Sequence, residues 1–186
     1  MATTTSRDLA RLVALLRERS VTHGDFVLAS GRRASYYIDA RRTTMSGEGQ
    51  ALIGVLGLAA LDANRWRPRS IGGLTLGADP VAYAIAHAAR LAGLQLDAFA
   101  VRKEPKTHGT GRRIAGCFTP GDPVVVIEDV ITTGRSALDA IAAVRAEGGQ
   151  VLGVLSVVDR EEGGRQDIEA AGVPVTALVA ASELGV

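Results

Sequence analysis

Two adjacent carboxylates followed by a hydroxyl-rich turn are the residues of this chain best suited to chemistry. The segment reads Val124-Val-Val-Ile-Glu128-Asp129-Val-Ile-Thr132-Thr133-Gly134-Arg135-Ser136. Its apolar run predicts a buried strand over 123–128, and a helix is expected to begin at about Ser136. Ligands bind where strands of an α/β sheet end, and the N–H groups of a helix N-terminus, with threonine hydroxyls beside them, suit a phosphomonoester.

The two carboxylates need a different partner, because they would repel a phosphate placed against them. Binding sugar hydroxyls, or a metal ion, is the natural role for Glu128 and Asp129. The alternative is a capped strand-to-helix turn with solvated acids. That alternative does not require two acids followed by Thr-Thr-Gly, so the functional interpretation is favoured.

A second candidate segment is cationic and lacks apolar periodicity. Residues 102–113 read Arg-Lys-Glu-Pro-Lys-Thr-His-Gly-Thr-Gly-Arg-Arg, which predicts a long loop between strands. The chain has 19 arginines and two lysines, and both lysines, Lys103 and Lys106, lie here. Chance in an arginine-biased sequence is one explanation, and a site that uses flexible point charges for phosphate is the other. Long loops in compact domains are usually functional.

Other familiar sites do not fit the sequence. Neither lysine follows a glycine, so there is no Walker A loop, and the glycines after Gly109 have the wrong spacing for a dinucleotide fingerprint. The three histidines have no zinc-site spacing. The single cysteine, Cys117, excludes an internal disulfide and a multi-cysteine metal cluster.

The surrounding pattern alternates between strands and helices. It begins with a helix around residues 9–16, with Ser6 as a plausible N-cap, and a hairpin-like pair, 26–28 and 35–39, after an interruption at Gly24. The remaining expected elements are a helix over 47–63 capped by Ser46, strand 70–74, helix 79–92, strand 97–101, strand 123–128, helix 136–147, strand 150–158, helix 163–171 and strand 174–179. This order predicts an α/β fold with a mainly parallel sheet flanked by helices.

Composition narrows the class of protein. With 186 residues, 47% hydrophobic and 22% charged, the chain is expected to form one globular domain. A net charge of +1 gives no general attraction to nucleic acid or to an anionic membrane. The longest apolar run, 51–61, is shorter than the roughly 20 residues of a membrane helix. No export pattern opens the sequence, so a cytoplasmic protein is expected.

The segment ending at Ser136 resembles the 5-phospho-α-D-ribose 1-diphosphate (PRPP) motif of type I phosphoribosyltransferases. Three more segments narrow the resemblance to the orotate phosphoribosyltransferases, and together they span nearly the whole chain in order. Arg102-Lys103-Glu-x-Lys106-x-His108-Gly109 resembles the catalytic loop of that family. Phe26-x-Leu28-x-Ser30-Gly31-x-x-x-x-Tyr36 resembles its substrate hood, and Asp159-Arg160-x-Glu162-x-Gly164 resembles its orotate-contacting turn.

The resemblance implies an enzyme that transfers the phosphoribosyl group of PRPP to orotate, giving orotidine 5′-monophosphate and pyrophosphate in de novo pyrimidine biosynthesis. It implies one domain over 1–186, with hood elements in about 1–45 and the core in about 46–186. Mg²⁺ is expected as cofactor, carried by PRPP without direct side-chain ligands. A homodimer is implied in which loop 102–113 closes over the neighbouring subunit's site, with no nucleic-acid or membrane partner.

Residue roles follow from the same resemblance. Glu128 and Asp129 would hold the ribose hydroxyls, with Asp129 and Lys106 as the catalytic pair. The 5-phosphate would be wrapped by Val130, Ile131, Thr132, Thr133, Gly134, Arg135 and Ser136. Arg102, Lys103, Lys106 and His108 would meet the pyrophosphate. Thr132 and Arg160 would contact orotate, since a guanidinium fork binds a carboxylate bidentately; from the residues alone, Arg160 could equally be an exposed charge.

The chain departs from the family pattern at two lysines. Ala29 stands where many members have a lysine before the Ser-Gly of the hood, and Leu76-Gly77 stands where many have Tyr-Lys. The glycine-rich 72–77 stretch can offer backbone amides to pyrophosphate, and Tyr37 and Ile38 are the positions expected against the orotate ring. Two alternatives stay open: a phosphoribosyltransferase for another base, and a non-catalytic, PRPP-sensing regulator that binds nucleic acid. The cationic loop and the lack of a surplus basic patch argue against the regulator.

Overall fold

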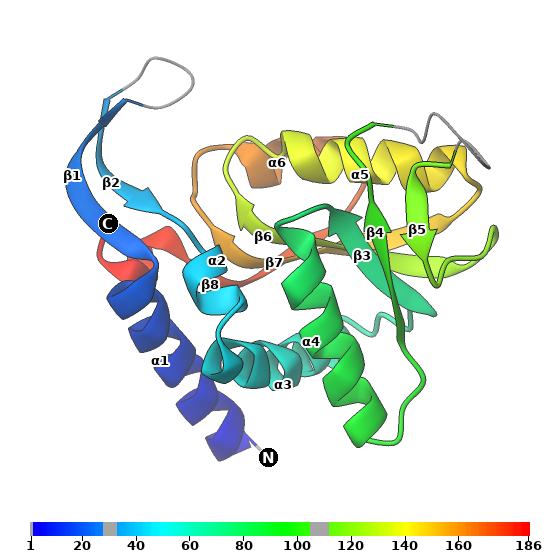
Figure 1. The fold of residues 1–186 in the computed structure, drawn as a ribbon, viewed down its shortest axis with the longest axis horizontal. Helices are drawn as coiled ribbons and strands as arrows, with labels where there is room; N and C mark the ends of the chain where they lie inside the picture. The colour runs from blue at the N-terminus through cyan, green and yellow to red at the C-terminus, as the bar shows by residue number, and fades with distance from the viewer. Residues whose placement is uncertain (1, 28–32, 105–111) are drawn as a thin grey trace.

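The computed structural model describes residues 2–27, 33–104 and 112–186, and its main body is a six-stranded sheet (Figure 1). The strands are β3 (Ser70–Leu74), β4 (Asp97–Val101), β5 (Ile114–Gly116), β6 (Pro123–Ile131), β7 (Gln150–Asp159) and β8 (Val175–Ala180). Their order is β5-β4-β3-β6-β7-β8, and only β5, on β4, pairs antiparallel. The predicted α/β fold with a mainly parallel sheet is confirmed.

Helices cover both faces of this sheet (Figure 1). One face carries α1 (Ala2–Arg19), α3 (Gly47–Ala63) and α4 (Ala78–Leu91), and the other carries α5 (Arg135–Ala146) and α6 (Gly164–Ala170). Two short helices, α2 (Arg41–Thr44) and η1 (Ala181–Leu184), complete the set within the described ranges. None of these helices is both long and apolar enough to cross a bilayer.

The central strand β6 supplies both hydrophobic cores. Val125 and Ile127 pack into the core under α1, α3 and α4, whereas Val124 and Val126 pack into the core under α5 and α6. All four side chains are fully buried. A strand covered on both faces must be apolar at every position, which explains the uninterrupted apolar run in the sequence.

A separate two-stranded hairpin projects from one end of the molecule (Figure 1). It consists of β1 (Val21–Val27) and β2 (Arg33–Ile38), paired antiparallel. The expected interruption at Gly24 is wrong: β1 runs through this residue, and the pairing register shifts between His23 and Phe26, as in a β-bulge. The connection between the two expected strands, 26–28 and 35–39, falls mostly in 28–32, outside the described residues.

Several elements begin and end as predicted. The helix over 47–63 and the strands over 70–74 and 97–101 have the expected bounds. Ser46 is the N-cap of α3, since its hydroxyl accepts a hydrogen bond of 3.1 Å from the Gly49 N–H. The Ser6 cap is wrong: α1 already begins at Ala2, and Ser6 is an exposed residue inside it, where a serine is tolerated.

The central strand is longer than predicted. It continues from residue 128 to Ile131, because β7 extends to Asp159 and offers a parallel partner along the whole length. Backbone N–H and C=O groups need partners whatever the side chain, so two carboxylates do not end a strand whose neighbour continues. The short strand β5 was not predicted, since three residues carry no periodic signal.

Trp66, between α3 and β3, fills the space at the opposite end of the sheet from the strand carboxyl ends. Its ring lies against Gly153 near the start of β7, where even a methyl side chain would collide with it. The ring packs on the core under α3 and α4. Gly153, in a mostly aliphatic strand, therefore leaves the space that the indole occupies.

Candidate active site

The turn between β6 and α5 encloses a small pocket at the carboxyl edge of the sheet. The pocket has a volume of about 70 Å³ and is lined by Glu128, Val130, Ile131, Thr132, Thr133, Gly134, Arg135 and Ser136. Gly134 is the N-cap of α5 and has φ +71°, a left-handed conformation that glycine adopts without strain. The first-turn N–H groups of a helix have no intrahelical acceptor, so this turn presents free donors beside the Thr132 and Thr133 hydroxyls.

Of the two carboxylates beside this turn, Glu128 is buried and Asp129 is half-buried. Glu128 is 6% exposed, and burial raises the pKa of its carboxyl to about 8, with the charge of the neighbouring Asp129 raising it further. Burial also raises the pKa of Asp129, although the Val130 N–H, which donates to Oδ1 at 2.9 Å, and the charge of Arg41 lower it. The pair therefore holds a proton near neutral pH, and the alternative of two solvated acids is wrong.

Gly77 packs directly against Asp129, which accounts for one departure from the family pattern. A Cβ atom at position 77 would lie 2.5 Å from Oδ1 of Asp129. Any side chain, a lysine included, would displace this carboxylate unless the backbone moved. The Asp129 carboxylate occupies the space that a side chain at position 77 would need, so the glycine is a packing requirement of this site.

Arg160 follows β7 directly and is buried, with its side chain 6% exposed. Its Nη2 atom forms an ion pair of 2.7 Å with Oε1 of Glu162, and its guanidinium lies 5.1 Å from the ring centroid of Tyr36. Its Nε has no hydrogen-bond partner among the described residues. The alternative of an exposed charge is therefore wrong, and the guanidinium keeps a donor that no residue in the described ranges accepts from.

The turn that bears Arg160 is hydrogen-bonded to the turn over residues 130–136, which is called the phosphate turn because it is predicted to bind phosphate. The Arg160 N–H donates to the Ile131 carbonyl at 2.9 Å, and the Gly164 N–H donates to the Thr132 carbonyl at 3.1 Å. Gly134 and Gly164 touch, since a Cβ on Gly134 would lie 2.6 Å from the Gly164 carbonyl oxygen. The two turns therefore form one packed unit.

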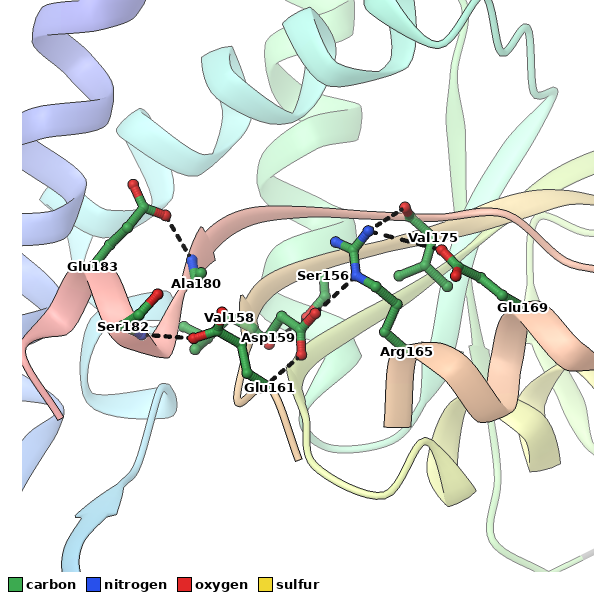
Figure 2. Close-up of polar contacts among 10 residues, drawn as sticks. All are labelled: Ser156, Val158, Asp159, Glu161, Arg165, Glu169, Val175, Ala180, Ser182 and Glu183. Carbon is green, nitrogen blue, oxygen red and sulfur yellow. Dashed lines mark hydrogen bonds and ion pairs between the residues drawn. The ribbon is translucent and has the colours of Figure 1, made fainter. Parts of the chain in front are cut away.

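A polar network fixes the Arg160 turn from behind, as Figure 2 shows. Asp159 accepts at Oδ1 from the Glu161 N–H and at Oδ2 from Arg165 Nε, both at 2.9 Å. Glu161 in turn accepts from the Ser182 N–H at 2.8 Å. The backbone on either side of Arg160 is thus held by Asp159 and by the C-terminal segment.

The two stems of the cationic loop are anchored on the sheet and on α5. The Arg102 N–H donates to the Arg113 carbonyl at 2.9 Å, and Arg113 forms a bidentate pair with Asp139 at 2.8 and 2.7 Å. Arg113 is therefore structural, although its sequence position is in the cationic segment. Arg102 is half-buried and Lys103 is exposed, whereas Lys106 and His108 lie outside the described residues.

The structure thus brings together the predicted ribose, phosphate and orotate residues and leaves two hood positions elsewhere. Ile38 is 6% exposed and belongs to the core under α1, and Tyr37 is 42% exposed with its ring 5.9 Å from that of Phe26. The neighbour of these residues, Tyr36, contacts Arg160 instead. The sequence did not predict the contact of Tyr36 with Arg160 or that of Gly77 with Asp129. The Arg-x-Glu spacing at 160–162 is the signal that could have indicated the ion pair of Arg160 with Glu162. Ala29 lies outside the described residues.

Among the described residues, no group of three or more His, Cys, Asp or Glu side chains is arranged to hold a metal ion. The carboxylates of Glu128 and Asp129 directly precede the turn over residues 130–136. Mg²⁺ commonly binds through substrate phosphates and one or two carboxylates, so this donor set fits a cation that arrives on a phosphorylated substrate.

No family model matches this chain. It does, however, have relatives that align with it over nearly its full length. The orotate phosphoribosyltransferase of Mycobacterium avium (strain 104) is 49% identical over 96% of this chain and 97% of that protein. The orotate phosphoribosyltransferase of Aquifex aeolicus (strain VF5) is 46% identical over 94% of this chain and 96% of that protein. The crystal structure of Mycobacterium tuberculosis H37Rv orotate phosphoribosyltransferase in complex with PRPP is similar with a TM-score of 0.83 and 43% identity, covering 96% of this chain and 99% of that one.

Proposed function

The chain belongs to the orotate phosphoribosyltransferase family, and we propose how its own residues divide the reaction of that family. The enzyme transfers the phosphoribosyl group of PRPP to orotate, giving orotidine 5′-monophosphate and pyrophosphate, in pyrimidine biosynthesis. The observation that supports this division of roles is the packed unit at the carboxyl edge of the sheet. It joins an anion-binding turn, an acid pair and a buried arginine.

PRPP binds with its 5-phosphate in the turn over residues 130–136. The free N–H groups at the start of α5 and the hydroxyls of Thr132 and Thr133 donate to the phosphate oxygens. Glu128 and Asp129 accept from the ribose hydroxyls, which places C1 of the ribose toward the Arg160 turn. Within the 72–77 stretch, residues 72–74 lie in β3 and the Thr75 N–H donates to the Val101 carbonyl, so the N–H groups of Leu76 and Gly77 contribute the donors for the pyrophosphate, in place of the family lysine at Gly77.

Orotate binds with its carboxylate on Arg160, whose guanidinium offers parallel N–H donors to both carboxylate oxygens. Thr132 gives a further contact from the phosphate turn. Because this turn and the Arg160 turn are hydrogen-bonded to each other, the two substrates are held in a fixed relation. Such positioning reduces the entropy that has to be lost at the transition state.

In the reaction, the bond from ribose C1 to the pyrophosphate oxygen breaks, a bond from C1 to a ring nitrogen of orotate forms, and the proton of that nitrogen is released. Negative charge accumulates on the leaving pyrophosphate, and Lys106 is positioned to stabilise it, with Arg102, Lys103 and His108 beside it. Asp129 faces the electron-poor ribose. Mg²⁺, which would be carried by PRPP, would supply further charge neutralisation at the pyrophosphate.

The functional enzyme is a cytoplasmic homodimer in which loop 102–113 of one subunit completes the site of its partner. The hairpin β1–β2 acts as the hood, within residues 1–45 of a single catalytic domain. A two-fold dimer permits this exchange, since each subunit can lend its loop reciprocally.

The substrate assignment is tested by incubating the enzyme with PRPP and Mg²⁺ and with orotate, uracil, adenine or hypoxanthine in parallel. Pyrophosphate release is expected with orotate only. Release with another base and not with orotate would replace the assignment with a phosphoribosyltransferase for that base. Release with none of the four would favour a non-catalytic role.

The shared site is tested by co-expressing Lys106→Ala, defective in the loop, with Asp129→Asn, defective in the ribose site. If the loop acts in trans, both defects meet in one site of a heterodimer and leave the other site intact. Random pairing makes about half of the dimers mixed, so the mixture, assayed at a low PRPP concentration at which each mutant homodimer is close to inactive, recovers roughly a quarter of the parental activity per site. A mixture no more active than the two homodimers, with heterodimers verified by mass spectrometry, contradicts the shared site.

A further inference from the structure

Two side chains from different parts of the chain contact the guanidinium of Arg160. Glu162 pairs with Nη2 at 2.7 Å, and the Tyr36 ring lies under the guanidinium carbon at 5.1 Å from the ring centroid. We propose that Tyr36 and Glu162 are positioning residues that fix this guanidinium for a carboxylate-bearing base and thereby determine base specificity. The inference rests on the proposed role of Arg160 in binding the orotate carboxylate.

The arginine side chain needs such support because its recognition of a carboxylate is directional. A bidentate pair forms only when the plane of the guanidinium lies in the plane of the carboxylate, whereas a long side chain has many rotamers. The ring face of Tyr36 defines the plane, and Glu162 defines the rotation within it. Arg160 Nε has no protein partner among the described residues, so this nitrogen does not contribute to the fixation.

Both positioning groups are themselves well anchored. Tyr36 lies in β2 opposite His23 and packs on the hydrophobic core under α1 and α3. The Glu162 side chain is 18% exposed and belongs to the turn whose backbone is fixed by Asp159 and Ile131. A cation over an aromatic face within about 6 Å is strongly attracted when both are shielded from water, which holds for the buried Arg160.

The arrangement makes the hairpin part of base recognition. Tyr36 is separated from Arg160 by more than a hundred residues, and its ring reaches the guanidinium because the hairpin lies beside the turn that follows β7. A neutral base without a carboxylate gains nothing from an oriented guanidinium. The contacts of Tyr36 and Glu162 therefore favour orotate over uracil-like bases without touching either of them.

The backbone of Arg160 is held independently of both groups, which makes side-chain tests clean. Its N–H bonds to Ile131, and the flanking residues are held by the Asp159 network of Figure 2. Removing the Tyr36 ring or the Glu162 charge should release the guanidinium while the turn stays in place. A general loss of structure would instead raise the KM for PRPP as well as that for orotate.

The kinetic test compares Tyr36→Leu, Tyr36→Phe and Glu162→Gln. We expect Tyr36→Leu to raise the KM for orotate about 5- to 30-fold and Glu162→Gln about 5- to 10-fold, with the KM for PRPP and kcat changed less than about 2-fold. Tyr36→Phe restores the ring and most of the orotate affinity. Glu169→Gln, which removes a carboxylate paired with Arg165 instead, is the matched control and should leave both KM values unchanged.

A double-mutant cycle separates positioning from direct contact. If Tyr36 acts only through Arg160, then Tyr36→Leu adds less than about 2-fold to the loss in kcat/KM for orotate already caused by Arg160→Ala. Multiplicative effects of the two changes would overturn the proposal. An equal rise in the KM values of both substrates in Tyr36→Leu and in Glu162→Gln would overturn it too.

A second readout does not depend on activity. The side-chain N–H signal of Arg160, assigned by its loss in Arg160→Lys, should be shifted upfield by the Tyr36 ring in the ligand-free protein. The shift is expected to persist in Tyr36→Phe and to vanish in Tyr36→Leu. If the shift vanishes while orotate kinetics stay parental, the positioning role is wrong; if the parent itself does not turn over orotate, the proposed function fails and the contact remains measurable.

Discussion

The two ends of the candidate site are built in opposite ways. The phosphate end is continuous in sequence: one strand, one turn and one helix start supply everything from Glu128 to Ser136. The orotate end is assembled from the hairpin and from the turn after β7, with Tyr36 and Glu162 meeting at Arg160. The first is held by backbone geometry and the second by side-chain contacts.

This difference teaches which part of the enzyme tolerates change. Backbone N–H donors at a helix start persist through most substitutions, so the phosphate end depends mainly on Gly134 and on its contact with Gly164. The orotate end depends on three side chains, each of which can be removed singly. We therefore expect base recognition to be lost by single substitutions more readily than phosphate recognition.

The largest loss of activity is expected at neither end but where the pyrophosphate leaves. Lys106→Ala should lower kcat about 10²- to 10³-fold, because its ammonium stabilises charge that grows as pyrophosphate departs. Steady-state kinetics with both substrates varied is the measurement. If kcat stays within a few-fold of the parent and only KM rises, Lys106 belongs with the binding residues.

At the orotate end, Arg160→Leu should raise the KM for orotate by one to two orders of magnitude, while the KM for PRPP stays nearly constant. The loss corresponds to about 1.5–3 kcal/mol for a charge-assisted contact. Initial rates at varied orotate and saturating PRPP give the value. Equal losses for both substrates would show that the two ends are a single structural unit without division of labour.

At the phosphate and ribose end, Asp129→Asn should weaken PRPP binding about 10-fold, since the amide keeps one acceptor and loses the charge. Orotate recognition should be little affected. Calorimetric titration with PRPP and Mg²⁺ measures the change, and an unaltered thermal transition verifies the fold. Unchanged affinity and turnover would remove Asp129 from the ribose site.

The last prediction concerns stability, not activity, and tests the state of the acid pair. Burial, then the Asp129 charge, raises the pKa of Glu128 to about 8 from the ordinary 4.5. Between these values the folded protein keeps a proton that the unfolded chain has released. The free energy of unfolding should therefore fall as pH rises through this window, by up to about 1.4 kcal/mol per pH unit.

Glu128→Gln should flatten this slope, although part of it remains because the pKa of Asp129 is raised as well. Urea denaturation of the ligand-free protein followed by circular dichroism at several pH values between about 5 and 8 gives the slope. Glu169→Gln, an exposed carboxylate, is the control. An identical slope in parent and Glu128→Gln would mean that Glu128 is ionised in the folded state.

The same division explains what the sequence reveals. The phosphate turn could be located from residue types because strand, turn and helix start are local features with known spacing. The alternation of elements likewise predicted the parallel sheet, and Ser46 marked the start of α3. The extension of β6 to Ile131 could not be predicted, since it depends on the length of β7, its neighbour in space.

The contacts that could not be predicted from the sequence are mainly those between segments far apart in the chain. Nothing in the local sequence indicates that Gly77 lies against Asp129, or that Tyr36 and not Tyr37 turns toward Arg160. Alternation along a strand places neighbouring residues on opposite sides, so a shift of one position exchanges the facing residue. The pairing of Val21 with Ile38 and of His23 with Tyr36 fixes that register, and it is a property of the paired hairpin.

The seat of Trp66 on Gly153 has a practical consequence for measurement. It is the only tryptophan of the chain, so intrinsic fluorescence comes from one known place, near the amino ends of the strands. The substrate turns lie at the carboxyl ends, so the emission spectrum should report loss of the core while remaining blind to bound PRPP or orotate. The protein thus carries its own optical reporter, by which unfolding can be followed during ligand titration without a correction for occupancy.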